Sequence, residues 1–290
     1  MLWISDEWKD YEVLDTSDGE RLERWGKYIL VRPDPQVIWN TPKERREWKK
    51  YDARYLRSNT GGGHWSDHKL PERWQIKYKD YLTFNVKPMN FKHTSVFPEQ
   101  AANWDFIREK VAGAAAKRPV RVLNLFAYSG GATLAAAAGG AEVYHVDASK
   151  GMVAWAKENA QASGLADRPI HWIVDDCGKF IQREIRRGRR YDGIIMDPPS
   201  YGRGPSGEIW KMETSFYPFL QETVKLLSDD PLFVIINSYT TGLAPSAVAY
   251  ASDVVFGSRY GGSTAAGELG LPVKESGLIL PCGATGRWTP

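Results

Sequence analysis

The sequence predicts an α/β protein whose Rossmann-like, seven-stranded sheet carries helices on both faces and follows a small β-rich domain. From about residue 120, short apolar stretches alternate with helical patterns, which is typical of a parallel sheet built from strand–helix–strand units. Before residue 95, apolar and polar residues alternate and seven of the twelve tryptophans occur, which indicates half-buried antiparallel strands. We therefore expect two domains, residues 1–94 and residues 95–290, and the first is a candidate for substrate recognition.

The elements of the second domain follow from their apolar patterns. The expected strands are 121–126, 142–147, 170–174, 192–197 and 232–237, with a last pair at 268–273 and 277–281. The expected helices between them are 131–138, 150–163, 179–187 and 212–227. Because strand–helix–strand crossovers are right-handed, these helices should cover both faces of the sheet.

The first domain shows shorter and more interrupted patterns. Strands are expected at 11–15, 27–31, 75–78 and 81–86. Asp18-Gly19 suits a tight turn. Prolines then punctuate the chain before an expected helix over residues 43–56, and Gly61-Gly62-Gly63 predicts a loop.

Composition excludes several classes of protein. The chain of 290 residues is 42% hydrophobic and 25% charged, as ordinary folded proteins are. No apolar run approaches the roughly 18–20 residues of a membrane-spanning helix, and the first residues do not resemble a signal peptide. Cys177 and Cys282 are too few for a disulfide framework or a zinc cluster, so we expect a cytoplasmic protein without a membrane partner. A net charge of +3 is compatible with RNA or DNA but does not demand either.

Small residues follow the strand at 121–126. The run Ala127-Tyr128-Ser129-Gly130-Gly131 lies between that strand and a helix, where small residues let a nucleotide approach the backbone. It is not a GxGxxG loop, because Ala127 stands where the first glycine would be, and it is not a phosphate-binding GxxxxGK[ST] loop. By itself the run fits a structural turn as well as a binding loop.

Acidic residues end the next two strands. Asp147 lies 17 positions after Gly130, near the offset at which such sheets bind both ribose hydroxyls. Asp176 follows the strand at 170–174, where an adenine amino group would be met. The alternative is that both residues cap the following helices, as aspartate often does. Polar signals at three successive strand ends favour a ligand site.

The fourth strand ends in Asp197-Pro198-Pro199-Ser200-Tyr201. Ligands of open α/β sheets bind beyond the carboxyl ends of the strands. Two prolines fix the backbone and remove two donors, which would leave carbonyl acceptors in the cleft beside the Asp197 carboxylate. Such acceptors suit a planar ring that bears an amino group. A rigid loop without a ligand is the alternative.

Residues 92–240 together resemble the class I S-adenosylmethionine-dependent methyltransferases of the large-subunit ribosomal RNA type, whose members methylate cytosine C5 or guanine N7 in 23S rRNA. The resemblance rests on the runs NLFAYSGGAT, EVYHVDASKG, VDDCGKFI and YDGIIMDPPSYGRG. Residues 97–104 resemble that family's F-x-D-Q-R-x-N-R element, which closes over the cofactor. Gln100 matches it, whereas Glu99, Ala101 and Trp104 depart from it. Residues 1–90 show no match to the family's RNA-binding modules.

The resemblance implies S-adenosylmethionine as cofactor and no metal. Loop 127–131 would hold its methionine part, Asp147 its ribose and Asp176 its adenine amino group, while Asp197 and Pro198 would border the methyl group and the acceptor. The candidate cofactor-binding residues are Gln100, Phe126, Ala127, Tyr128, Ser129, Gly130, Asp147, Ala148, Asp176, Cys177 and Asp197. The candidate catalytic residues are Asp197, Pro198, Pro199 and Tyr201.

The positions of the cysteines predict which atom of the base accepts the methyl group. Cytosine C5 needs a transient bond from a thiolate, and the relatives that methylate it carry a cysteine after the fifth strand. Here Ser238-Tyr239-Thr240 stands there, and Cys177 and Cys282 fit small core residues better than nucleophiles. Since a base nitrogen needs only positioning, we expect N-methylation of a base in RNA, ribosomal RNA foremost. The alternatives are methylation of a small molecule or a protein, and a catalytically silent RNA-binding protein.

Two runs of basic residues are candidates for binding a nucleic-acid partner. Residues 43–57 hold seven basic residues against three acidic ones, with aromatic residues between them. A helix there would either grip phosphates and stack on bases, or be a solvated helix whose aromatic side chains face the core. The run at 183–190 fits a helix C-terminus, which favours cations. His64 and His68 have no third ligand nearby in sequence, so no metal site is expected.

Overall fold

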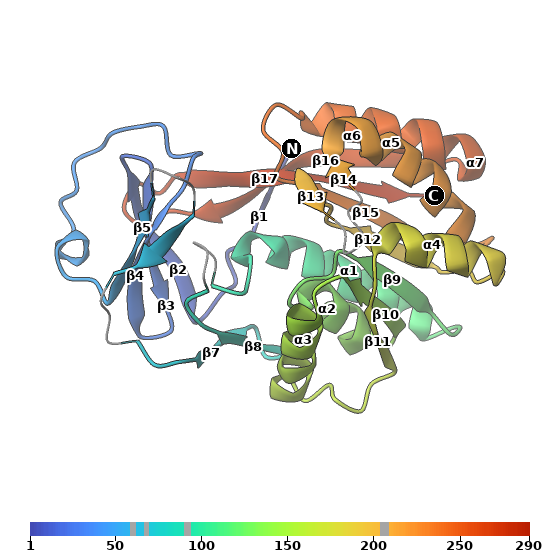
Figure 1. Cartoon of the computed structure of the whole chain (residues 1–290), viewed down its shortest axis with the longest axis horizontal. Coiled ribbons are helices and arrows are strands. Elements are labelled where there is room, and N and C mark those ends of the chain that lie inside the picture. Colours follow the sequence, from blue (N-terminus) through green and yellow to red (C-terminus); the bar gives the residue numbers. More distant parts are fainter. Residues whose placement is uncertain (59–61, 67–69, 90–93, 204–208) are drawn as a thin grey trace. The chain divides into compact units, whose positions relative to one another are not determined.

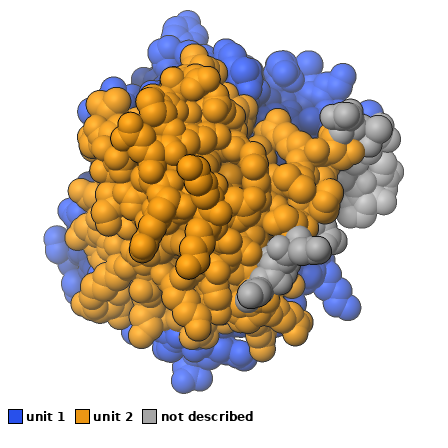
Figure 2. Space-filling view, turned by 90° about the vertical axis from the view of Figure 1, so that its left-hand side faces the viewer, with its two compact units in different colours: residues 1–3, 102–269, 283–290 blue, residues 4–101, 270–282 orange. Residues whose placement is uncertain are grey.

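The computed structural model describes residues 1–58, 62–66, 70–89, 94–203 and 209–290, and divides into two compact units (Figures 1 and 2). The sheet unit comprises residues 1–3, 102–269 and 283–290. The N-terminal unit comprises residues 4–101 and 270–282. The domain boundary expected near residue 95 stays a prediction.

The sheet unit contains the predicted parallel sheet. Strands β9, β10, β11, β12 and β15 pair in parallel in the order β15-β12-β9-β10-β11, and β17 pairs with β15 antiparallel. Among the described residues the sheet has eight strands, because β1 joins the edge beyond β16 and was not predicted. The strands are β1 Leu2–Ile4, β9 Arg121–Leu125, β10 Glu142–Asp147, β11 Ile170–Val174, β12 Gly193–Met196, β15 Phe233–Ser238, β16 Ser263–Pro272 and β17 Ile279–Thr289.

Helices cover both faces of this sheet, as predicted (Figure 1). One face packs against α4 (Cys177–Arg186), α5 (Met212–Thr223) and α6 (Pro245–Ser252) around Leu123, Leu125 and Ile194, all fully buried. On the other face the Asn124 side chain bonds to α2. The remaining longer helices are α1 Ala101–Ala115, α2 Gly131–Ala138 and α3 Lys150–Ala162. The short helical segments are η2 Pro98–Gln100, η3 Val224–Leu226, the π-helical η4 Asp253–Gly257 and α7 Ser258–Tyr260. No helix in the described part of the chain is long and apolar enough to cross a membrane.

Two parts of the sheet unit differ from the prediction. The helices at 101–115 and 245–260 lack a clear apolar stripe in the sequence, and α6 begins directly at Pro245, the position where proline suits a helix start. The last two strands, β16 and β17, are much longer than predicted. Their glycines suggest irregular chain, yet several pack where a side chain would clash; a Cβ at Gly283 would lie 2.7 Å from the Tyr239 ring.

The N-terminal unit is built mainly from antiparallel strands, as expected. Its sheet has the order β2-β3-β4-β5-β6, and β7 pairs with β8 as a hairpin. Asp18 and Gly19 have φ values of 51° and 72° and form the predicted tight turn between β2 and β3. The strands are β2 Tyr11–Ser17, β3 Glu20–Trp25, β4 Tyr28–Pro33, β5 Ala53–Arg57, β6 Gly63–Trp65, β7 Trp74–Tyr78 and β8 Leu82–Val86; β13 Tyr201–Arg203 and β14 Ile209–Lys211 belong to the sheet unit.

Strand β3 was not predicted because four of its six residues are charged. Its Glu23 is fully buried, and its carboxylate accepts hydrogen bonds from Arg32 at 2.6 and 2.7 Å and from the Tyr11 hydroxyl at 2.7 Å. Burial alone would raise the pKa of Glu23, but Arg21 and Arg32 outweigh it and lower that pKa to about 2. A buried charge with such partners is tolerated in a core where an unpaired one is not.

The helix predicted over residues 43–56 is wrong. The structure has a single 3-10 turn, η1 (Arg46–Trp48), followed by β5, which pairs in parallel with β4. Three of the seven basic side chains are held by acids from other elements: Lys43 by Asp18 and Glu20, Arg45 by Glu275, and Arg54 by Glu20. Hence no basic helix forms, because tertiary ion pairs and strand pairing override the local helical pattern. Trp48 and Tyr51 pack against the buried Leu14, Leu22 and Val31, as the second interpretation expected of the aromatic side chains, and contact of this run with phosphates stays a prediction.

Candidate functional site

The loop after β9 is folded tightly against its neighbours in the sheet unit. Phe126 and Tyr128 have positive φ values of 55° and 49°, and Gly130 has 90°. The strained backbone is fixed by hydrogen bonds: the Ala127 amide donates to the carbonyl of Val146 at 3.1 Å, and the Tyr128 amide donates to Asp147 Oδ2 at 2.9 Å. Strain of this kind persists only where the surroundings hold it, and it gathers at functional sites.

The two glycines of this loop have no room for a side chain. A Cβ at Gly130 would lie 3.0 Å from the Cβ of Ala156 in α3, and one at Gly131 would lie 2.4 Å from the ring of Trp104 in α1. Asn159, a fully buried residue of α3, donates to the carbonyl of Ser129 at 2.9 Å. Close packing against α1 and α3 therefore requires glycine at both positions, and the loop presents bare backbone there.

Asp147 ties this loop to the next strand. Its Oδ2 accepts from the Tyr128 amide and its Oδ1 accepts from the Ser149 amide at 2.8 Å. Burial raises the pKa of the Asp147 carboxyl, and the bonds from Ser149 and Tyr128 partly offset that effect. Each carboxylate oxygen accepts more than one bond, so Asp147 keeps acceptor capacity for a ligand hydroxyl. The exposed Ala148 follows it directly.

Asp176 is a helix cap, the alternative that the sequence left open. Its side chain accepts from the Lys179 amide at 2.9 Å at the start of α4. This bond uses Oδ1 and leaves Oδ2 for a ligand, so capping and binding are compatible. Asp175 is engaged by Arg183.

Cys177 lies beneath the loop and not in the open. It is buried, and its Sγ accepts from the Phe126 amide at 3.3 Å. Burial raises the pKa of the Cys177 thiol far above its ordinary value. Cys282 belongs to the N-terminal unit, and burial raises its thiol pKa as well. Burial thus disfavours the thiolate, the nucleophilic form of cysteine, at both positions.

A small hairpin folds over the prolines that follow β12. Strands β13 and β14 pair antiparallel directly after them. The Trp210 Nε1 donates to the carbonyl of Pro199 at 2.6 Å, and the hydroxyls of Thr240 and Ser200 are hydrogen-bonded at 2.8 Å. Of the carbonyl acceptors expected in the cleft, that of Pro199 thus already accepts a bond from an indole of a later segment, and the expectation itself stays a prediction.

An aromatic cluster joins the hairpin to the loop after β9. The ring of Trp210 lies 5.4 Å from that of Phe126 and 5.3 Å from that of Phe219, and the last two are 5.6 Å apart. Tyr201, on the facing strand β13, is 52% exposed. The sequence did not single out Trp210, since nothing in its neighbourhood repeats a known motif; an aromatic residue nine positions after Tyr201 was the only available signal.

The structure brings most of the predicted residues to one edge of the sheet. Asp147 stands opposite Val174 in register, Met196 opposite Leu125, and the Asp197 amide donates to the Leu125 carbonyl at 3.4 Å. Pro198 is buried, whereas Pro199 is exposed. Gln100 lies in the N-terminal unit and is buried there. The roles expected for these residues in binding and catalysis stay predictions.

A buried histidine, which the sequence did not single out, supports the loop from below. His145 in β10 is fully buried; its Nδ1 is 2.9 Å from the Thr133 hydroxyl, which also accepts from Asn124. Burial lowers the pKa of His145 from 6.5 to about 3. Among the described residues no cluster of three or more His, Cys, Asp or Glu side chains is placed to hold a metal ion; His64 lies in β6, and His68 lies outside the described residues.

Acid should weaken the fold through His145. Its pKa is lower in the folded chain than in the unfolded one, so the unfolded chain binds the proton first as the pH falls from about 6.5 toward 3. From pH 7 to pH 5 the free energy of unfolding should drop by about 2 kcal/mol more in the wild type than in His145→Asn. Urea titrations at both pH values measure this difference; equal pH dependence in the two proteins would show that His145 does not titrate in this way.

The comparison with protein families decides the class. A family model described as S-adenosylmethionine-dependent methyltransferase matches residues 36–230, well over half of the chain. The chain belongs to this family. Its cofactor is therefore S-adenosylmethionine, the methyl donor that the family's description names.

Solved and curated relatives agree with this assignment. The structure is similar to the S-adenosylmethionine-dependent methyltransferase of Agrobacterium tumefaciens, with a TM-score of 0.93 and 36% identity over 100% of this chain and 93% of that one. The ribosomal RNA large subunit methyltransferase K of Neisseria meningitidis is 37% identical over 45% of this chain and 37% of its own length. The methyltransferase K/L of Shewanella baltica is 37% identical over 72% of this chain but only 26% of its own length. The chain thus spans about a quarter to a third of these curated relatives.

The hairpin over the prolines should matter for the methyl acceptor. Trp210→Phe keeps the ring but removes the Nε1 donor to Pro199, so we expect the KM for the acceptor to rise about fivefold, the scale of one net hydrogen bond of about 1 kcal/mol. Trp210→Ala also removes the ring contacts with Phe126 and Phe219 and should cost more. Steady-state kinetics test whether the alanine variant is more impaired than the phenylalanine variant. If the two are equally impaired, the effect comes from the lost hydrogen bond to Pro199 and not from the lost ring packing.

Proposed function

We propose that the chain transfers the methyl group of S-adenosylmethionine to a nitrogen of a base in RNA, with ribosomal RNA as the substrate and the cytoplasm as the place of action. The RNA substrate is supported by the names of the curated relatives, which are ribosomal RNA methyltransferases. The choice of nitrogen is supported by the chemistry of the site. The single observation that carries it is the placement of the cysteines: Cys177 is buried with its Sγ bonded to the Phe126 amide, and no cysteine directly follows β15.

The residues at the sheet edge fit the cofactor. The bare backbone at Gly130 and Gly131 would hold the methionine part, in a loop whose strained backbone is fixed by bonds to Val146 and Asp147. The free acceptor capacity of Asp147 suits the ribose hydroxyls, and the second oxygen of Asp176 suits the adenine amino group. When bound, S-adenosylmethionine supplies a methyl group that its sulfonium sulfur already activates.

The protein's own task is then to align the acceptor. Asp197, at the end of β12, would accept a hydrogen bond from an amino or imino group of the base, which turns a ring nitrogen toward the methyl group. The buried Pro198 fixes the backbone there, and the exposed Tyr201 offers a ring face on which a base can stack. Holding two reactants in line at near-attack distance supplies much of the rate gain in such reactions.

Carbon methylation would need a thiolate, and the two cysteines are unsuited to that role. Cys177 is buried and its Sγ accepts from the Phe126 amide. Ser238, Tyr239 and Thr240 follow β15, where relatives that act on cytosine C5 carry the nucleophile. A nitrogen acceptor brings its own lone pair and needs no covalent intermediate.

Removing the thiols tests this chemistry. Cys177→Ser and Cys282→Ser, singly or together, should keep most of the methyl-transfer activity, because neither sulfur reacts. An RNA substrate that contains 5-fluorocytosine traps enzymes that use a thiolate on C5, and we expect no stable adduct on a denaturing gel. An adduct that disappears in one of the cysteine variants would overturn the nitrogen assignment and identify the nucleophile.

A further inference from the structure

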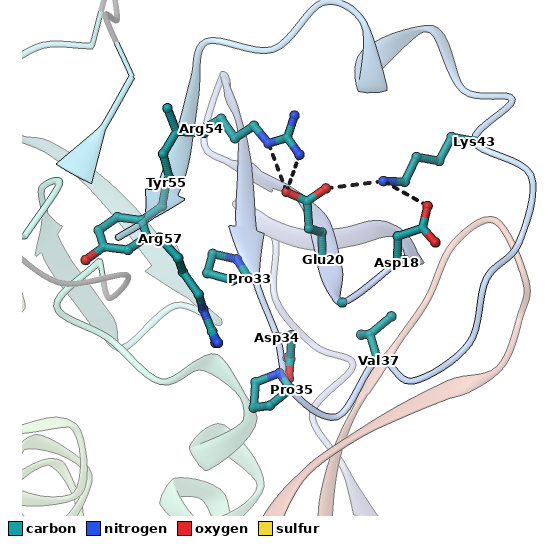
Figure 3. A pocket seen from close by; sticks show the side chains of 12 residues that line it. Asp18, Glu20, Pro33, Asp34, Pro35, Val37, Lys43, Arg54, Tyr55 and Arg57 are labelled. Carbon is teal, nitrogen blue, oxygen red and sulfur yellow. Dashed lines mark hydrogen bonds and ion pairs between the residues drawn. The ribbon is translucent and has the colours of Figure 1, made fainter. Parts of the chain in front are cut away.

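The N-terminal unit contains an open pocket of about 600 Å³, whose lining includes none of the candidate cofactor-binding or catalytic residues (Figure 3). Three segments of that unit form it: the β2–β3 turn, the chain that follows β4, and strand β5. Its volume lies within the roughly 300–1,000 Å³ of small-molecule and cofactor sites. Its lining is Asp18, Gly19, Glu20, Pro33, Asp34, Pro35, Val37, Lys43, Arg54, Tyr55, Leu56 and Arg57.

Backbone hydrogen bonds hold the pocket walls in place. The Gly19 amide donates to the carbonyl of Val37 at 3.0 Å, and the Asp34 amide donates to the carbonyl of Gly19 at 2.7 Å. The ring of Tyr55 packs edge-on against Trp65 at 5.5 Å. The pocket is thus formed before a ligand arrives, which lowers the entropy cost of binding.

The charges that line the pocket are paired except for one. Lys43 contacts Asp18 at 3.5 Å and Glu20 at 3.2 Å, and Arg54 contacts Glu20 at 2.7 Å. Asp34 lies 3.6 Å from Arg21. Within the described part of the chain, Arg57 is exposed and makes no ion pair, and Figure 3 shows it extending from β5 toward the side on which Asp34 and Pro35 lie. Its guanidinium is therefore available to an anion.

We propose that this pocket takes one unpaired nucleotide of the substrate RNA, with a phosphate on Arg57, and this inference rests on the RNA substrate proposed above. The apolar floor of Pro33, Pro35 and Val37 suits the face of a base. The carboxylates of Asp18 and Asp34 suit its amino groups, since carboxylates accept from such donors. An acidic peptide would meet three carboxylates at once, which opposes its binding. Unpaired nucleotides are the usual targets of sequence-dependent RNA recognition.

The first test separates this pocket from the methyl-transfer site. Arg57→Gln should raise the KM for RNA about tenfold and leave kcat unchanged, because the variant loses one charge-assisted phosphate contact. The slope of log affinity against log salt should become less steep by about 0.7, the value for one phosphate of a single strand. Lys50→Gln is the control: it removes an equally exposed cation of the same unit that does not line the pocket. Equal kinetics and equal salt slopes for wild type and Arg57→Gln would overturn the inference.

A second measurement works without methyl transfer. The four nucleoside 5′-monophosphates are titrated into the full chain, and amide NMR shifts are followed. We expect shifts at residues 18–20, 33–37 and 54–57 in the wild type that are lost in Arg57→Gln. No shift there at millimolar ligand, or the same shifts in the variant, would overturn the pocket assignment. A wild type that binds the monophosphates but methylates no RNA would instead overturn the proposed function.

Discussion

Asp197→Ala is expected to reduce kcat for methyl transfer to RNA at least 100-fold, while S-adenosylmethionine still binds. Asp197 follows directly after β12, where its amide bonds to the Leu125 carbonyl, and we propose that its carboxylate orients the base. Misplacing the acceptor by about 1 Å is enough for a loss of that size. Single-turnover kinetics with saturating cofactor measure it.

Asp197→Asn is the matched control for this experiment. It keeps a carbonyl acceptor of the same shape but loses the charge, so its rate should fall between those of the wild type and Asp197→Ala. If the alanine variant methylates RNA at the wild-type rate, Asp197 has no part in positioning the acceptor.

Asp147→Ala should weaken the binding of S-adenosylmethionine by at least tenfold. The variant loses the acceptor for the ribose and also the partner of the Tyr128 amide, which fixes the loop after β9. Losing a hydrogen bond to a charged group costs about 1.5–3 kcal/mol, which corresponds to roughly tenfold or more in affinity. Isothermal titration calorimetry measures the affinity, and circular dichroism checks that the variant is folded.

The neighbouring strand end provides the control for Asp147. Asp175 follows β11, and its carboxylate is engaged by Arg183, so Asp175→Asn should change cofactor affinity little. Unchanged affinity in a folded Asp147→Ala would remove that residue from the cofactor site.

The parallel sheet was predictable because each of its strands is a short apolar run with a fixed place between helical patterns. The predicted bounds of β10 and β11 agree with the structure, and those of β9, β12 and β15 differ by one residue at one or both ends. The central strands β12 and β15 are buried along their whole length, so burial alone selects their residues and the signal is local. The same holds for α2, whose alanines favour a helix in any context.

The N-terminal unit was harder to predict because its charges are internal. Glu23 and Arg32 read as surface residues in the sequence, yet they form a buried pair. Lys43 and Arg54 suggest an exposed basic helix, yet both are bound to Glu20 from another strand. Such pairs join residues that lie far apart in the chain, and no local pattern encodes them.

In the candidate site, too, some residues could be predicted from a local sequence pattern and others could not. Asp147 and the small-residue loop stand out because one helix and one strand, α2 and β10, set the spacing between them. The Trp210 indole that occupies the Pro199 carbonyl comes from a separate hairpin, and the His145 that supports the loop from below reads as an ordinary strand residue. Both contacts depend on tertiary packing, so only the structure reveals them.

The most direct test of the proposed function follows the methyl group itself. Ribosomal RNA from cells that lack this protein is incubated with the purified chain and S-adenosylmethionine that carries a deuterated methyl group, then digested to nucleosides and analysed by mass spectrometry. We predict one labelled nucleoside whose fragments place the label on a nitrogen of the base. A label on cytosine C5 or on the ribose, or RNA that stays unlabelled under conditions in which the chain binds the cofactor, would contradict the proposed reaction.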